Sequence, residues 1–341
     1  MRRLRIILGS AAATLGVVLA LALAAGLWAY QGPGPATDGG ATRVVLLRKG
    51  AGLTEIASTL ERSGAIRSKS LFAAAAQITG AAKSLKAGEY EFKSRASMAS
   101  ILRDIRDGKI VIRQITIPEG MTSEVAVALL AARPDLTGVV PAPPEGSILP
   151  ETYQYERNED RAAVLKRMMD ARDELLALLW ANRQPGLPFK TPDEAVILAS
   201  IVEKETGIAS ERPQVAAVFV NRLRQNMRLE SDPTIIYGLN GGKPLGRGLK
   251  ASEMAASNPY NTYQIPGLPP TAIANPGRAA LAAVLDPPKT DYLFFVADGG
   301  GGHVFASTYE EHLKNVAKWR AVERQRAAAA LQERAAELKA Q

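Results

Sequence analysis

The chain has 341 residues, of which 47% are hydrophobic and 22% charged, and its formal net charge is +8. This composition suits a folded chain with one membrane-spanning helix and about two globular domains. The absence of cysteine excludes disulfides, thiolate nucleophiles and cysteine zinc sites, and two histidines are too few for a metal cluster. The basic residues are scattered along the chain, so we expect no nucleic-acid partner. Given the few metal-binding residues, we also expect no metal and no cofactor.

The N-terminus has the pattern of a membrane anchor. Three arginines within the first five residues precede a segment that carries no charge up to Gln31. About 20 apolar residues span a bilayer as a helix, and basic residues stay on the cytoplasmic side. We predict a cytoplasmic tail (1–5), a transmembrane helix (6–30) and a flexible Gly/Pro-rich linker (31–42). The rest of the chain would lie on the periplasmic side of the cytoplasmic (inner) membrane. The alternative is a cleaved signal peptide, whose apolar region would be shorter.

Residues 43–120 predict a small α+β module. Apolar residues alternate at strand spacing near its two ends and recur at helical spacing between them. The initial strand–helix–helix–strand order is similar to that of a LysM-like glycan-binding module, and the alternative is a plain spacer domain. The expected elements are a strand and a helix over 43–66, a helix over 68–79, a strand over 85–92, a helix over 97–108 and a strand over 110–120.

Residues 121–341 predict a second domain. A helix and a proline-rich passage come first, and a long helix over 161–182 follows. The segments 221–239 and 257–277 contain Tyr, Asn, Thr and Pro, and we expect long polar loops there. Tyrosine rings in such loops often stack on sugars, and the alternative is that these are rigid proline turns. A β-hairpin with a glycine tip and a long charged helix from Thr308 end the chain. The tyrosines that we expect to stack on sugars are Tyr237, Tyr260 and Tyr263.

The segment "TPDEAVILASIVEKETG", residues 191–207, predicts an apolar helix that ends with two carboxylates. Thr191 is the expected N-cap, and Glu194 completes a capping box. At about 100° per residue, Glu205 falls in the middle of the apolar stripe, whereas Glu203 falls on the opposite side.

A carboxyl group in an apolar environment has a raised pKa and can act as a general acid near neutral pH. Glu205 is therefore the candidate catalytic residue. The structural alternative is that Glu205 forms a buried ion pair with Arg212 or Arg222.

Five segments together resemble the family of endolytic murein transglycosylases, which are membrane-anchored enzymes. They occur in the family's order between residues 195 and 305, and the anchor and the small module also fit its layout. The resemblance implies a transmembrane helix, a LysM-like α+β module (43–120) and an α/β catalytic domain with a C-terminal helical tail (121–341). The segments are "ASIVEKET", "SERPQVAAVFVNRL", "SDPTIIYGL", "YNTYQIPGLPPTAIANPG" and "YLFFVADGGGGHVF".

The resemblance also implies a reaction and a site. Glu205 takes the position of the family's catalytic glutamate. The implied activity is that of a lyase which cleaves the MurNAc–GlcNAc bond within nascent peptidoglycan strands, leaves 1,6-anhydroMurNAc ends and terminates strand elongation. Peptidoglycan synthases are the implied partners. Two alternatives stay open, namely a muramidase-type hydrolase and a non-catalytic glycan-binding scaffold. The residues expected to line the cleft are Asn221, Arg222, Ser231, Asp232, Thr234, Tyr237, Asn261, Thr262, Tyr263 and Asn275.

Overall fold

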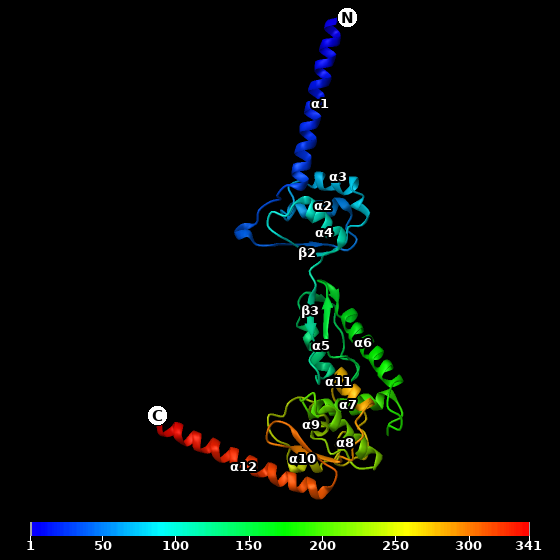
Figure 1. Cartoon of the computed structure of the whole chain (residues 1–341), viewed down its shortest axis with the longest axis vertical. Helices are drawn as coiled ribbons and strands as arrows, with labels where there is room; N and C mark the ends of the chain where they lie inside the picture. The colour runs from blue at the N-terminus through cyan, green and yellow to red at the C-terminus, as the bar shows by residue number, and fades with distance from the viewer. Residues whose placement is uncertain (1, 341) are drawn as a thin grey trace. The chain divides into compact units, whose positions relative to one another are not determined.

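The computed structural model describes residues 2–340 and has a mixed α+β architecture (Figure 1), which confirms the expected fold class at this level. The chain divides into two units, and each is described by itself. Unit 1 consists of the residues up to 113 together with 154–158. Unit 2 consists of residues 114–153 and those from 159 onward.

Unit 1 begins with the long helix α1 (Arg2–Gln31). Its segment Ala13–Gln31 is long and apolar enough to cross a bilayer, and none of this segment is buried. The arginine-rich head that we predict before it lies outside the described side chains. The following segment, which we expect to be a flexible linker, is tied down instead. The Gly34 N–H donates to the Arg95 carbonyl at 3.1 Å, and the Arg95 N–H donates to the Pro35 carbonyl at 3.1 Å.

The rest of unit 1 packs helices on a two-stranded antiparallel sheet. Strands β1 and β2 pair with Val45 opposite Tyr90, and the sheet's inner face buries Tyr90 completely. Phe72 and Leu60, on two of the helices, are also fully buried. The elements match the predicted order and are β1 (Arg43–Leu47), α2 (Leu53–Arg62), α3 (Lys69–Ile78), β2 (Gly88–Phe92) and α4 (Met98–Asp107), with short 3-10 turns at Asp38–Gly40 and Ala81–Lys83.

Unit 2 is mainly helical, and its strands form two-stranded ladders. Strand β3 pairs with β5, β4 pairs with β6 in parallel, and β7 pairs with β8 in an antiparallel hairpin. The elements are β3 (Arg113–Thr116), α5 (Ser123–Ala131), β4 (Leu136–Thr137), β5 (Thr152–Tyr155), β6 (Glu159–Asp160), α6 (Arg161–Ala181), α7 (Pro192–Glu205), α8 (Arg212–Arg224), α9 (Asp232–Asn240), α10 (Ala251–Ala255), α11 (Arg278–Leu285), β7 (Phe294–Ala297), β8 (His303–Ala306) and α12 (Tyr309–Ala340).

Helix α7 is the central helix of unit 2 and packs against α8 and α11 (Figure 1). The predicted capping box is present, because the Thr191 hydroxyl accepts from the Glu194 N–H at 3.2 Å and the Glu194 carboxylate accepts from the Thr191 N–H at 3.2 Å. Leu198 and Val196, on opposite sides of the helix, are both buried. The helix is therefore enclosed on nearly all sides rather than along one stripe.

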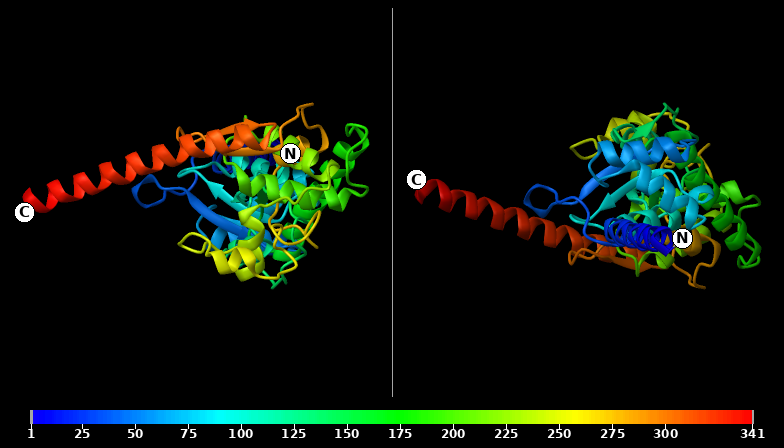
Figure 2. Two further views of the ribbon diagram at one scale, coloured as in Figure 1. Left: turned by 90° about the horizontal axis from the view of Figure 1, so that it is seen from below. Right: turned by 90° about the horizontal axis from the view of Figure 1, so that it is seen from above.

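We expect a polar loop over 221–239, and this prediction is wrong at both ends, because residues up to Arg224 belong to α8 and those from Asp232 onward form α9. Ser231 precedes the helix, Pro233 lies in its first turn, and Gly241 ends it with a left-handed backbone (φ 70°). Proline early and glycine just after the end are ordinary helix boundaries, so the start and stop signals were present. The β7–β8 hairpin and α12 are confirmed, and Figures 1 and 2 show the C-terminal end of α12 extending away from the other elements of unit 2.

Candidate active site

Glu205 is the last residue of α7, and its side chain is partly buried. The Ser231 hydroxyl, at the start of α9, donates a hydrogen bond of 2.5 Å to its Oε1 atom. None of the ion pairs found among residues 2–340 involves Glu205. The two arginines that could neutralise it have other partners, since Arg212 pairs with Glu203 and Arg222 with Glu230. The structural alternative of a Glu205–arginine ion pair is therefore wrong.

Burial raises the pKa of Glu205 to about 7. The hydrogen bond from Ser231 opposes this rise because it favours the ionised carboxylate, and the negative charge of Asp232 adds to it. Electrostatic interactions with His303 and Arg222 lower the pKa by smaller amounts. Because the result lies near neutrality, this carboxyl group exchanges its proton readily at physiological pH, as a general acid and base must.

Glu203 is two residues away but has a different role. Its carboxylate accepts from Arg212 Nη2 at 3.0 Å and from the Gly277 N–H at 2.8 Å, and its side chain is 3% exposed. Arg212 also donates to Glu119 at 3.0 Å. A Cβ atom on Gly277 would meet the Glu119 carboxylate at 2.0 Å, so the Gly277 backbone lies directly against this cluster. Glu203 therefore fixes the end of α7 against α8 and the start of α11.

Two buried threonine hydroxyl groups hold Ser231 in place. The Ser231 N–H donates to the Thr262 Oγ1 at 2.9 Å, and the Thr234 hydroxyl donates to the Ser231 carbonyl at 2.6 Å. The two threonine hydroxyls lie 2.9 Å apart, and neither threonine is exposed. Ser231 itself is 1% exposed. Because Ser231 is fixed from both sides, its hydroxyl can orient the carboxyl group of Glu205.

Asp232 and Tyr263 form the second pair at this site. The Tyr263 hydroxyl donates to Asp232 Oδ1 at 2.8 Å. Burial, together with this bond and the charges of Asp232 and Glu205, raises the pKa of Tyr263 well above its ordinary value. The structure thus brings Glu205, Ser231, Asp232 and Tyr263 into one connected group.

Four other residues from the predicted cleft bind backbone atoms. Asn221 Nδ2 donates to the carbonyls of Thr290 and Tyr292 at 2.7 and 3.0 Å, before strand β7. Arg222 donates to the Leu293 and Leu229 carbonyls at 2.7 and 2.9 Å. These bonds hold the hairpin and the turn before Ser231 against α8.

Asn261 and Asn275 have similar roles in unit 2. Asn261 Nδ2 donates to the Ala256 carbonyl at 2.8 Å, and its Oδ1 accepts from the Tyr263 N–H at 3.0 Å. Asn275 Oδ1 accepts from the Ile148 N–H at 3.0 Å, and its Nδ2 donates to the Met121 carbonyl at 3.1 Å. A role for these two residues in substrate contact stays a prediction.

The other two tyrosines contact each other rather than the Glu205 group. The rings of Tyr237 and Tyr260 are 4.9 Å apart between centroids, and both rings pack against the core of unit 2. The Tyr260 hydroxyl lies 2.8 Å from the Thr271 hydroxyl. Burial raises the pKa of Tyr237 to about 12. Their use as sugar platforms also stays a prediction.

One polar pair near the site was missed from the sequence. Glu211 accepts from the His303 N–H at 2.9 Å, and its other oxygen lies 2.8 Å from His303 Nδ1. Burial alone would raise the pKa of Glu211, but the bonds from His303 hold it below its ordinary value. These two residues are 92 positions apart, so only the fold reveals the pair. Among the side chains that the structure describes, no group of three or more His, Asp or Glu could hold a metal ion.

Comparison with known proteins places the chain in a family. Residues 45–318 match the YceG-like family, so the chain belongs to that family. An endolytic murein transglycosylase of Bacillus subtilis is 27% identical over 315 residues, which cover 83% of this chain and 86% of that protein. One of Streptococcus pneumoniae R6 is 29% identical over 320 residues, covering 79% of this chain and 57% of that protein.

A solved structure is also similar. The crystal structure of a YceG-like protein from Listeria monocytogenes aligns with a TM-score of 0.51 and 27% identity. The alignment covers 80% of this chain and 98% of the Listeria chain.

Proposed function

We propose that the protein is a peptidoglycan lytic endotransglycosylase that cleaves the MurNAc–GlcNAc bond within glycan strands. The observation that carries this proposal is that Glu205 is a partly buried carboxyl group without an ion-pair partner among the described residues. Burial raises its pKa to about 7, whereas the buried Glu89 and Glu203 are each paired with arginine. The pKa of the partly buried Glu145 is also raised by burial, but both its oxygens accept from the Ser123 N–H. The names of the relatives support the substrate class.

The reaction needs a single carboxyl group that first donates and then accepts a proton. Glu205 gives its proton to the oxygen that links MurNAc C1 to GlcNAc, and the C1–O bond breaks. The ionised Glu205 then removes the proton from the C6 hydroxyl of the same MurNAc. O6 bonds to C1, and this closes the 1,6-anhydro ring. No water is consumed, and Glu205 ends in its initial protonated state.

The neighbours of Glu205 fit both halves of this cycle. The negative charge of Asp232 favours the protonated acid before cleavage and would stabilise positive charge that develops at C1. The Ser231 hydroxyl donates to the carboxylate and so stabilises it after the proton has left. Most hydrolases of this kind use a second carboxylate to activate water or to attack C1. Glu203 is unsuited to that task, because Arg212 and the Gly277 N–H bind its oxygens.

The N-terminal part of the chain supports a location at the membrane. We infer that α1 anchors the protein in the cytoplasmic membrane with its N-terminus inside, and that the chain after α1 lies on the outer side. The strand–helix–helix–strand order of unit 1 supports a LysM-like role in glycan binding. An enzyme anchored there would meet strands as synthases extend them, and it would terminate elongation by cleaving them.

Product analysis separates this proposal from its alternatives. The full chain in detergent is incubated with purified sacculi, and the released fragments are identified by mass spectrometry. A lytic transglycosylase leaves anhydro ends, which are lighter by one water than the reducing ends that a muramidase leaves. Glu205→Gln should release nothing, whereas Glu124→Gln on the exposed surface of α5 should match the unmodified chain. Reducing ends would establish the hydrolase, and binding without cleavage would establish the scaffold.

A further inference from the structure

Helix α3 of unit 1 is apolar on two sides. Phe72 and Ala76 are buried in the module, as expected for a helix that covers a sheet. The other side also carries apolar residues at helical spacing but faces outward, and Ile78 at its end is 86% exposed. Lys69, Ser70 and Gln77 are exposed, so the polar residues of α3 are few and the apolar ones cover more than the face that packs on the module. The residues of α3 on this side are Leu71, Ala74, Ala75 and Ile78; Ala74 and Ile78 are exposed, whereas Leu71 and Ala75 also pack against the core of unit 1.

The outward side of α3 faces the end of the membrane-spanning helix that is nearer the module. The two helices line an apolar groove of about 480 Å³. Figure 1 shows α3 lying crosswise to α1 at this end. An apolar groove that continues along a membrane-spanning helix is continuous with the hydrocarbon of the bilayer. The residues that line it are Leu19, Ala22, Leu23, Gly26, Leu27, Tyr30, Leu71, Ala74, Ala75, Ile78 and Thr79.

Contacts made by the last turn of α1 and by the residues directly after it hold α1 against the module. Tyr30 packs against the core of unit 1. The backbone bonds between Gly34, Pro35 and Arg95 then hold the chain directly after the helix. A Cβ atom on Gly34 would lie 2.1 Å from the Ala96 carbonyl oxygen, so this close approach requires glycine. The groove is therefore part of the fold of unit 1.

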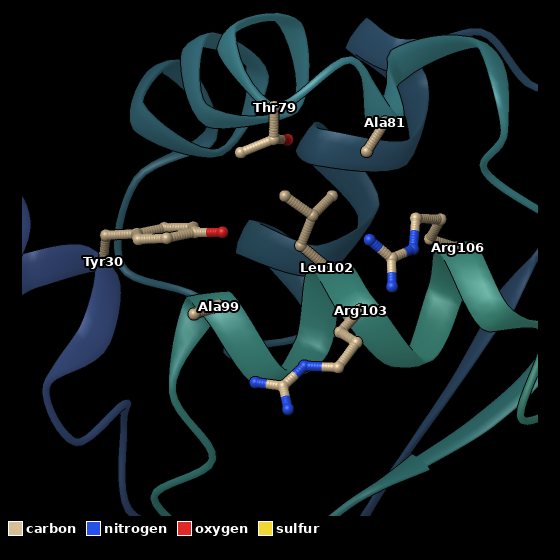
Figure 3. A pocket seen from close by; sticks show the side chains of 7 residues that line it. All are labelled: Tyr30, Thr79, Ala81, Ala99, Leu102, Arg103 and Arg106. Carbon is tan, nitrogen blue, oxygen red and sulfur yellow. The ribbon is translucent and has the colours of Figure 1, made fainter.

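A second, polar hollow of about 140 Å³ adjoins the groove, and Tyr30 and Thr79 line both. Figure 3 shows the Tyr30 hydroxyl directed into this hollow, with Arg103 and Arg106 contributed by α4. Arg103 has no ion-pair partner among the residues that the structure describes. Arg106 uses its Nε atom for Asp107 at 2.9 Å, which leaves its terminal nitrogens to other acceptors. Both arginines line the hollow beside the apolar groove, their guanidinium groups lie apart in Figure 3, and Asp107 is the carboxylate nearest to them.

We propose that this site binds one anionic phospholipid of the outer leaflet. Its phosphate would lie between Arg103 and Arg106, and one acyl chain would fill the groove between α1 and α3. Guanidinium groups recognise phosphate oxygens through paired hydrogen bonds, and tyrosine prefers the boundary between headgroups and hydrocarbon. The bound lipid would hold α3 in the plane of the membrane surface. This proposal rests on the proposed anchoring by α1.

Native mass spectrometry of the full chain, released from detergent, tests the proposal. The chain is mixed with equal amounts of dioleoyl phosphatidylglycerol and dioleoyl phosphatidylcholine, and the retained lipids are counted. We expect one retained phosphatidylglycerol. The double variant R103Q/R106Q should weaken its retention by about 10- to 30-fold, given about 1 kcal/mol for each arginine near an anionic surface. The variant R48Q/R62Q removes two exposed arginines outside the hollow and should retain the lipid as the unmodified chain does.

The apolar half of the site has its own test. Ile78→Asn adds no charge and changes an exposed side chain, so the module should fold, and retention of phosphatidylglycerol should fall. Equal retention of both lipids, or equal loss in R103Q/R106Q and R48Q/R62Q, would overturn the proposal. So would displacement of the phospholipid by a polyprenyl diphosphate at equal concentration, because the occupant would then be a lipid-linked glycan precursor.

Two further measurements separate this proposal from those on which it rests. The intact mass of the chain and its resistance to alkaline extraction from membranes report whether α1 is retained as an anchor. The release of muropeptides reports catalysis. An anchored, active chain that shows no selectivity for phosphatidylglycerol refutes the lipid site alone.

Discussion

Replacing Glu205 by glutamine should stabilise the folded chain at alkaline pH. The pKa of Glu205 rises on folding from 4.5 to about 7. Below pH 4.5 the carboxyl group is protonated in both the folded and the unfolded chain, so it contributes no pH dependence there. As the pH rises from 4.5 to 7, the unfolded chain ionises first, and the folded chain loses relative stability. Above pH 7 this loss is complete. Because glutamine does not ionise, the Glu205→Gln chain does not lose this stability.

The magnitude follows from the pKa change. At about 1.36 kcal/mol per pH unit, the loss amounts to about 3 kcal/mol. This is an upper bound, because Glu205 keeps some contact with solvent. For a domain of this size, each kcal/mol changes Tm by about 2–4 °C, so the difference should reach several degrees at pH 8.

Thermal unfolding of the full chain in detergent, followed from pH 4 to pH 9, measures this difference. The Tm values of the unmodified chain and of Glu205→Gln should nearly coincide at pH 4 and diverge through neutrality, with the variant more stable. Glu124→Gln, on the exposed surface of α5, is the matched control and should have the Tm of the unmodified chain at every pH. Glu203→Gln should lower Tm because Arg212 loses a charged partner. A Tm difference for Glu205→Gln that does not change with pH would refute the assignment of a raised pKa.

The remaining predictions concern the neighbours of Glu205. Ser231→Ala removes a bond that favours the carboxylate, so the alkaline limb of the pH–activity profile should move to higher pH and kcat should fall by about tenfold or more. Asp232→Asn removes a charge that favours the protonated acid, so the alkaline limb should move to lower pH. If both variants shifted the limb in the same direction, the roles of Ser231 and Asp232 in setting the pKa of Glu205 would be wrong. Arg212→Gln leaves the buried Glu203 without its charge partner and should cost about 3–5 kcal/mol in denaturant unfolding, and a loss below about 1 kcal/mol would show that the pair is not structural.

The sequence predicted most of the local structure, because local signals determine it. The capping box of α7 involves residues three positions apart, so Thr191 and Glu194 were identifiable without the fold. Helical periodicity likewise predicted α6 and α8. The same signals marked α9 through Pro233 and Gly241, but the polar character of the segment was given more weight, and the helix was missed.

The site was predictable only in part, because its contacts join distant positions. Helix geometry and family resemblance both selected Glu205 as the candidate catalytic residue, and its catalytic role stays a proposal. They did not show that Ser231, 26 residues further along, donates to it. Nor did they show that Arg212 and Gly277 bind Glu203, the latter across 74 residues. Treating α7 as a one-sided helix placed Glu203 on the wrong kind of surface, since tertiary packing encloses the helix.

The protonation state of Glu205 is the property on which the proposed mechanism depends, and infrared difference spectroscopy reports it directly. Spectra of the full chain are recorded from pH 4 to pH 9, and those of Glu205→Gln are subtracted. The difference should contain the carbonyl band of one protonated carboxyl group, which disappears with a midpoint near pH 7 as a carboxylate band grows. A carboxylate band already complete at pH 5 would show that Glu205 has no proton to donate at neutral pH, and the assignment of the general acid would then be wrong.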